Sequence, residues 1–313
     1  MLEAGLVAAR FLHYATALAL FGLALFPLYT YPSRACPPPA RLARWLHGMV
    51  TWAMLGAFLS AIALGVFAVA NMTGDLSAAA DRETLQSVIR ETGFGQVWVV
   101  RLGLFVALLV LVARRRASVP DHPDWVTPLV AGALLVSLAG VGHTQASDGM
   151  MRMIHMCCDG VHLLAAGAWL GGLLALGYLL MSTRGSPSPD EAADARVALV
   201  RFSGMGYLAV AALVGSGLIN IWCLVRPVTA LTETTYGQLL VVKLCLFAGM
   251  LVLAASNRLW LVPSLLCEKK TGRPSASLRR LRQNVLGEQA LGLLTVLIVS
   301  YLGTLPPTIG ASQ

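Results

Sequence analysis

The chain has 313 residues, of which 57% are hydrophobic and only 12% are charged. This composition excludes a protein that hides its apolar side chains in one soluble core, and it indicates that lipid serves as part of the solvent. The formal net charge of +8 then reflects how Lys and Arg are divided between the two sides of a membrane, and we expect no nucleic-acid partner.

Eight apolar runs follow one another along the chain, each long enough to cross a bilayer as a helix, which takes roughly 20 residues. They cover 4–28, 46–70, 96–113, 126–142, 157–181, 203–224, 237–256 and 286–304. No basic segment precedes the first run and no cleavage site follows it, so we expect a retained helix. The sequence predicts an all-α polytopic membrane protein, a bundle of eight transmembrane helices in one domain over 1–313.

The distribution of basic residues predicts the orientation of this bundle. If the first connection is cytoplasmic, the inside connections hold sixteen Lys and Arg and the outside connections hold four. The positive-inside rule then predicts that both termini are periplasmic. The basic last inside connection is suited to anionic membrane lipid. The longest outside connection, 71–95, is acidic and weakly amphipathic, and we expect it at the outer interface or as a lid or docking surface.

In chain order, the runs place a layer of polar residues in the outer third of the membrane. These are Arg10 and His13 in the first run, Arg101 in the third, His143 at the end of the fourth, His162 in the fifth, Asn220 in the sixth and Lys243 in the seventh. Ionisable groups at such depth are costly unless they face the bundle interior, pair with one another or bind something. Their common level predicts a functional site near the outer face.

The fifth run carries the pattern most typical of a metal site. His155, Asp159 and His162 are spaced i, i+4 and i+7, which places them on one helix face, with Cys158 beside them. Imidazole, thiolate and thioether ligands favour copper, and a carboxylate can fix the tautomer of a ligating imidazole. A plainer interpretation is that His155 is interfacial and that His162 makes one hydrogen bond between helices.

Sulfur-containing residues precede and overlap this stripe. Met150, Met151, Met153 and Met156 lie within seven residues, beside Cys157 and Cys158. Methionine is an ordinary filler of membrane interfaces, and vicinal cysteines can be structural, but together these residues favour capture of a soft ion. The predicted copper ligands are therefore His13, His143, His155, His162, Asp159, Met151, Met156 and Cys158.

The three cations of the outer layer favour a second hypothesis. Histidines at matched depth on different helices can hold haem b, and Arg10, Arg101 and Lys243 could meet its propionates. His13 and His162 would then be axial ligands of a b-type cytochrome or cupric reductase. A second, inner pair of histidines embedded in helices is missing, since only His47 lies near the cytoplasmic face in a helix, so electron flow through two haems is not expected.

Two other patterns predict architecture. Gly167 and Gly171 have the GxxxG spacing that permits close contact between helices. Arg258 and Glu288 fall at a similar inner depth of the seventh and eighth runs, and we expect them to form a structural ion pair.

Several segments in order along the chain resemble the copper resistance D (CopD) family of inner-membrane proteins. They are RFLHYATALAL at 10–20, GH at 142–143, HMCCDGVHLLAAGAWLGGL at 155–173, YGQLLVVKLCLF at 236–247, NRLWLVP at 257–263 and LRRLRQNVLGEQALGLLTVLIVSYLGTLPP at 278–307. The resemblance implies a copper-handling protein of the bacterial inner membrane that works with a periplasmic carrier of the CopC type. It also implies that the polar positions of the family pattern are His13, His143, His155, Asp159 and His162.

From residues and resemblance together we expect a protein that binds copper from the periplasmic side and passes it inward, without enzymatic activity. The haem-binding cytochrome is one alternative, with redox activity. Another is a partner that only docks and stabilises a periplasmic copper carrier. No glycine-rich loop indicates nucleotide use, and no nucleophile and base constellation indicates hydrolysis.

Overall fold

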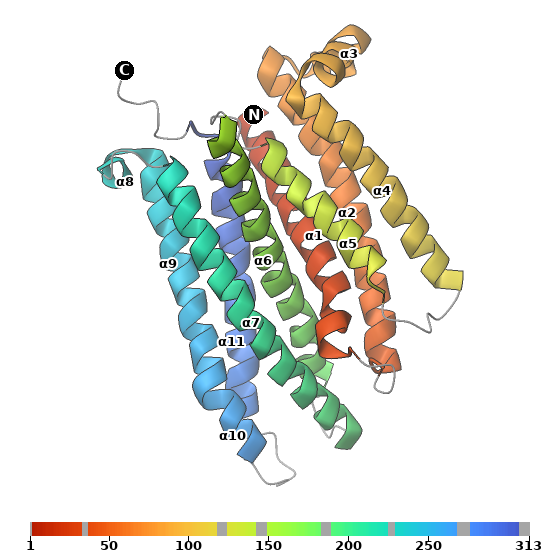
Figure 1. Ribbon diagram of the computed structural model, residues 1–313, viewed down its shortest axis with the longest axis vertical. Helices are drawn as coiled ribbons and strands as arrows, with labels where there is room; N and C mark the ends of the chain where they lie inside the picture. Colours follow the sequence, from red (N-terminus) through yellow and green to blue (C-terminus); the bar gives the residue numbers. More distant parts are fainter. Residues whose placement is uncertain are drawn as a thin grey trace.

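The computed structural model describes residues 2–32, 37–117, 124–141, 149–182, 189–224, 229–267 and 276–306, and these residues contain helices and no strand. Long helices account for most of them (Figure 1): α1 (Leu2–Thr30), α2 (Ala40–Thr73), α4 (Gly93–Ala117), α6 (Gly149–Ser182), α7 (Pro189–Leu224), α9 (Thr235–Ser256) and α11 (Ala276–Leu302). Seven helices in the described part are long and apolar enough to cross a membrane. The all-helical membrane fold is thus confirmed at this level.

The fourth predicted crossing is shorter than expected. Residues 126–136 form α5 (Val126–Val136), and the chain continues as the 3-10 turn η2 (Ser137–Val141). The apolar helix of this region, Val126–Gly140, is below the length of the other seven. Eight full crossings therefore stay a prediction. Figure 1 nevertheless shows α5 rising between the descending α4 and α6, so that α1 begins and α11 ends at the same end of the bundle.

Several helices extend well beyond the apolar runs that predicted them. α6 begins at Gly149 rather than near 157, α7 begins at Pro189 rather than near 203, and α11 begins at Ala276 rather than near 286. Hydropathy identifies only the apolar part of a helix. The helical hydrogen bonds continue through polar turns that contain no helix-breaking residue. Pro189 suits the first turn of a helix, where its missing N–H is not needed.

Short elements complete the two ends of the bundle. After α2, the turn η1 (Ser77–Ala80) leads to α3 (Arg82–Glu91), whose first turn is capped by Asp81 accepting from the Thr84 N–H at 2.8 Å. Hydrogen bonds from the side chain and the backbone of Thr84 lower the pKa of the Asp81 carboxyl. Near the C-terminal half, α8 (Ala230–Glu233) precedes α9, and a π-helical turn, η4 (Asn257–Leu261), joins α9 to α10 (Val262–Cys267).

The core lies where α1 and α6 cross, at the centre of the bundle. α1 packs against α2, α5, α6, α7 and α11. A Cβ added to Gly22 of α1 would lie 2.1 Å from the carbonyl oxygen of Gly167, and one added to Gly171 would lie 2.6 Å from the Gly22 Cα. The predicted GxxxG contact is confirmed, and its partner is α1. This contact fixes the two helices that carry Arg10, His13 and His162 of the polar layer.

Candidate functional site

A cavity of about 530 Å³ occupies the end of the bundle where α1, α6 and α9 begin. Most of its lining is apolar, contributed by all seven long helices and η2. The polar lining residues are Arg10, Tyr14, Arg101, His155, Asp159, His162, Asn220, Tyr236, Lys243 and Thr295. The predicted convergence of Arg10, Arg101, His162, Asn220 and Lys243 is confirmed. His143 lies outside the described residues.

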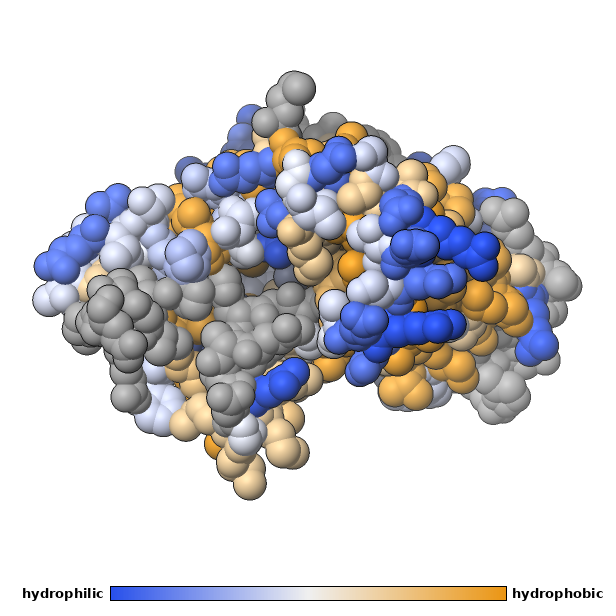
Figure 2. Space-filling view, turned by 90° about the horizontal axis from the view of Figure 1, so that it is seen from above, coloured by the Kyte–Doolittle hydropathy of each residue, from blue (hydrophilic) through white to orange (hydrophobic). Residues whose placement is uncertain are grey.

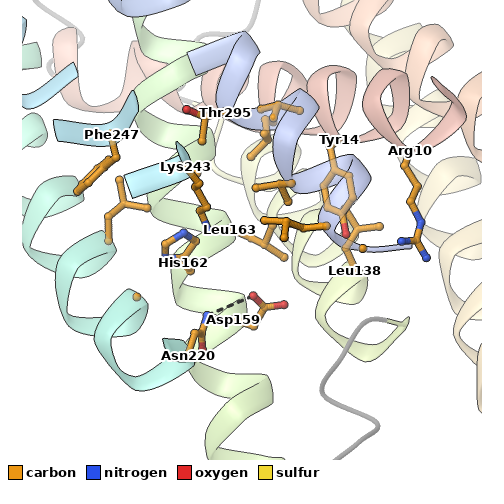
Figure 3. Close-up of a pocket in the computed structure, with 18 of the residues that line it drawn as sticks. Arg10, Tyr14, Leu138, Asp159, His162, Leu163, Asn220, Lys243, Phe247 and Thr295 are labelled. Carbon is orange, nitrogen blue, oxygen red and sulfur yellow. Dashed lines mark hydrogen bonds between the residues drawn. The ribbon is translucent and has the colours of Figure 1, made fainter. Parts of the chain in front are cut away.

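The three residues of the α6 stripe all face this cavity, as their helical spacing predicted. His155 is only 2% exposed, and its Nδ1 has no hydrogen-bond partner among the described residues. Asp159 accepts from Asn220 Nδ2 at 3.4 Å, the contact drawn dashed in Figure 3. The Oδ1 of Asn220 is likewise buried without a described partner. Buried polar atoms left unpaired are costly, so this corner of the cavity is prepared for a ligand or water.

Hydrogen bonding assigns the tautomer of His162. The Ser216 hydroxyl donates to the Ala212 carbonyl at 2.5 Å, so its one proton is already used. The 3.0 Å contact between Ser216 Oγ and His162 Nδ1 therefore has the imidazole N–H as donor. The Nε2 atom of His162 is then the lone-pair nitrogen, which is the state that ligates a metal. Figure 3 shows the ring beside Lys243.

His13 has a different environment. It is fully buried outside the cavity lining, and its Nδ1 lies 3.1 Å from the Ala57 carbonyl and 3.0 Å from Ser60 Oγ. Because a carbonyl only accepts, Nδ1 carries the proton, and Nε2 accepts from Arg101 Nη2. Both ring nitrogens are thus bonded within the protein. The geometry makes His13 a support for the Arg101 guanidinium, whose Nη1 also donates to the Leu134 carbonyl at 3.1 Å and to Ser137.

The soft ligands do not gather with the histidines in the described residues. Met151 is exposed, Met156 and Cys158 are half-buried, and none of the three lines the cavity. Cys158 and Cys223 are free thiols within electrostatic range of each other across α6 and α7. Among the described residues, no group of three or more His, Cys, Asp or Glu is arranged to hold a metal ion. The seven predicted ligands other than His143 therefore do not form one assembled site in the described part of the chain.

The predicted ion pair between Arg258 and Glu288 is wrong. Glu288, 2% exposed, accepts from Trp169 Nε1 at 3.3 Å and from Asn257 Nδ2 at 2.7 Å. The Arg258 Nε donates to the Tyr207 hydroxyl at 3.3 Å instead. The π-helical turn beginning at Asn257 shifts the register of this segment, which presents Asn257 to Glu288. Trp169 lines the cavity, so this network lies directly behind its inner wall.

Ser216 and Tyr14 were missed by the sequence reasoning. Ser216 decides which nitrogen of His162 is free, and Tyr14 lies within electrostatic range of Arg10, Arg101 and Asp159. A lone Ser or Tyr in an apolar helix has no periodic partner to single it out. Only the packing of α7 against α6, and of α1 against both, reveals them.

Similarity to known proteins covers almost the whole chain. The family model "Copper resistance protein D-like, N-terminal domain" matches residues 1–154, and "Copper resistance protein D" matches residues 196–302. The chain is 30% identical to Copper resistance protein D of Pseudomonas syringae pv. tomato over 308 residues, 98% of each chain. It is 28% identical to Inner membrane protein YebZ of Escherichia coli over 96% of this chain and 98% of YebZ.

A longer relative is also similar. Copper transport protein CutJ of Bacillus subtilis is 30% identical over 309 residues, which are 97% of this chain but only 53% of CutJ. The chain therefore spans about half the length of that relative. No solved structure matches.

Proposed function

We propose that this chain, which belongs to the copper resistance protein D family, takes copper from the periplasmic side and passes it toward the cytoplasm. The chain is a multi-pass inner-membrane protein: a relative that covers nearly its whole length is named an inner membrane protein, and seven of its described helices are long and apolar enough to span. Two relatives are named for copper resistance and copper transport. These findings support a copper-related membrane protein; the direction is our proposal.

The observation that carries the proposal is the state of the α6 histidines. His162 lines the cavity with its Nδ1 proton given to Ser216, which leaves Nε2 available as a ligand. His155 adds a buried unpaired nitrogen, and Asp159 lies on the same face. Neutral imidazole nitrogens suit both oxidation states of copper. Because His155, Asp159 and His162 are not arranged around one metal position in the described structure, we propose that copper binds as cargo to His162 and to His155 in turn along α6, with Asp159 as the residue that orients one of them.

The first turns of α6 supply a way to reach these residues. Met150, Met151 and Met153 are exposed at the end of the bundle where the cavity lies. Figure 2, which views this end, shows hydrophilic side chains gathered over it, with apolar residues along the flanks. Exposed thioethers can accept a soft ion from another protein. We propose that a periplasmic copper carrier of the CopC type delivers copper here.

Copper binding by purified variants tests the site. His162→Ala should weaken stoichiometric copper binding, and Ser216→Ala should weaken it about tenfold, because the orienting hydrogen bond of a metal-ligating histidine is lost. His47→Ala, on α2 at the opposite end of the bundle, is the matched histidine control and should bind like the wild type. Equal copper affinity in His162→Ala and wild type, with both folded, would contradict the proposed ligand.

Cytoplasmic copper content tests the direction. Cells that express this chain with a periplasmic copper carrier should accumulate more cytoplasmic copper, and become more copper-sensitive, than cells with the carrier alone. His162→Ala should remove the difference. A fall in cytoplasmic copper would mean export. An unchanged level of cytoplasmic copper, together with stabilisation of the carrier by this chain, would favour the docking role.

The pair of haem ligands proposed from the sequence does not fit the described geometry. Axial ligands approach the iron from opposite faces, but His13 lies outside the cavity with both nitrogens bonded. His155 and His162 share one face of α6, so they cannot take its place as a pair. Among the described residues, the histidines that line the cavity both come from α6, so the cavity offers no pair of histidines from facing helices. An absorption spectrum of the purified protein tests this, and a Soret band lost in His162→Ala would favour haem.

A further inference from the structure

The charged lining of the cavity is unbalanced. Arg10 of α1, Arg101 of α4 and Lys243 of α9 all line it, whereas Asp159 is the single Asp or Glu in its described lining. With the histidines counted as neutral, the three cations and Asp159 leave a formal excess of two positive charges around an otherwise apolar space. In a membrane, such an excess is costly unless something of opposite charge compensates it.

Around Arg101, the described residues do not supply that compensation. The Arg101 side chain is 1% exposed, and its three hydrogen bonds go to the Leu134 carbonyl, the Ser137 hydroxyl and the neutral His13 ring. All three acceptors are uncharged, so they orient the guanidinium but leave its charge unbalanced. This support uses the buried His13 ring, and it holds the cation at the wall of the cavity.

Lys243 faces the cavity from the other side. Asp159 is in electrostatic range of Lys243, but Asp159 also faces His155 and Tyr14 and accepts from Asn220. Figure 3 shows Lys243 and Asn220 across the cavity from Tyr14 and Arg10. Arg10 also lines a smaller cavity of about 230 Å³ together with Glu3. Arg101 and Lys243 are therefore the two cations of the cavity that we consider as anion-binding groups.

We propose that this cavity binds the acidic group of an amphiphilic anion, a phosphate or carboxylate, between Arg101 and Lys243, with the apolar lining around the body of the ligand. An arginine fork and a lysine ammonium are the groups that recognise such oxyanions. A volume of about 530 Å³ lies within the range of small-ligand sites, which are largely apolar with a few polar groups. This site goes beyond the proposed copper function and does not depend on it.

Two sources can present this chemistry, and one binding experiment separates them. The purified full chain, delipidated in detergent, is titrated with phosphatidylglycerol, with phosphatidylethanolamine as the zwitterionic lipid, and with inorganic phosphate alone, with native mass spectrometry as the readout. We expect phosphatidylglycerol to bind at one saturable site. Binding of inorganic phosphate at the same site would identify the free anion as sufficient.

Variants at Lys243 test whether the anion binds in the cavity. Lys243→Met should weaken anion binding about tenfold, the loss expected for one charge-assisted hydrogen bond, and Lys243→Arg should restore it. Arg258→Gln removes the same charge outside the cavity lining and should bind like the wild type. Equal losses in Lys243→Met and Arg258→Gln, or no preference for phosphatidylglycerol over phosphatidylethanolamine with no phosphate binding, would overturn the proposal. Copper binding is measured separately on His162→Ala, so a failure of the copper proposal and a failure of the anion proposal can be told apart.

Discussion

Two histidines of the outer layer show how one partner decides the role of a residue. In His13 the ring donates to a backbone carbonyl and accepts from Arg101, so no lone pair is left for a ligand. In His162 the ring donates to a serine that has already used its proton, so in the neutral ring the second nitrogen carries the lone pair. Both histidines occupy apolar helices, and only their neighbours distinguish a support from a proposed ligand.

Removing His13 should therefore affect folding more than copper binding. His13→Ala takes from the buried Arg101 guanidinium one acceptor, and hydrogen bonds to charged groups contribute roughly 1.5 to 3 kcal/mol. We expect a lower thermal midpoint in detergent, with copper affinity of the folded fraction unchanged.

His13→Gln is the companion variant, because an amide oxygen can accept from Arg101. It should recover part of the lost stability. If His13→Ala instead abolished copper binding at an unchanged thermal midpoint, His13 would be a ligand after all.

At the scale of helices, the arrangement depends on the contact between α1 and α6. Gly22, Gly167 and Gly171 bring the two backbones together more closely than any side chain permits. This contact places Arg10 and Tyr14 of α1 opposite His162 and Asp159 of α6 across the cavity. The site is thus a consequence of a glycine contact about one and a half to three helical turns away along each helix.

A single methyl group tests this contact. In Gly171→Ala the new Cβ would lie 2.6 Å from the Gly22 Cα, so the two backbones must separate, and overpacking of this kind costs roughly 1 to 3 kcal/mol. We expect a lower thermal midpoint and weaker copper binding.

Gly204→Ala in α7 is the matched control, since nothing described lies within 4 Å of its added Cβ. Alanine is the better helix former, so this variant should be as stable as the wild type or more stable. Similar losses in both variants would show that the α1 and α6 contact is not special.

For the molecule as a whole, the alternation of segments puts the start of α1 and the end of α11 on one side. α1 begins and α11 ends at the end of the bundle that holds the cavity, and α5 runs between α4 and α6 despite its short length. The positive-inside rule predicts that this end is periplasmic. The orientation matters for function, because it decides whether the histidines of α6 meet copper before or after it crosses.

Reporter fusions test this topology. A reporter active only in the periplasm should work when fused after Gln313, and a cytoplasmic reporter fused there should be inactive. A fusion within the 118–123 connection, between α4 and α5, should give the reverse pattern. An active periplasmic reporter at both positions would mean that α5 does not cross the membrane.

The amino-acid sequence by itself determined the class of fold, the membrane environment and most polar residues of the cavity. Hydrophobic runs, basic connections and the i, i+4, i+7 spacing of His155, Asp159 and His162 are patterns of local spacing. Such spacing can be read directly from the order of residues along the chain. The GxxxG motif indicated a close helix contact, and the order of polar residues along the runs predicted which of them share a level.

Only the tertiary structure decided what each polar residue does. The pairing of His13 with Arg101, of His162 with Ser216, and of Glu288 with Trp169 and Asn257 joins residues 31 to 119 positions apart. Such partners are set by the rotation of each helix about its axis and by local turns such as η4, which no periodicity encodes. A hydrogen bond needs atoms within about 3 Å, and that precision arises only when the helices pack.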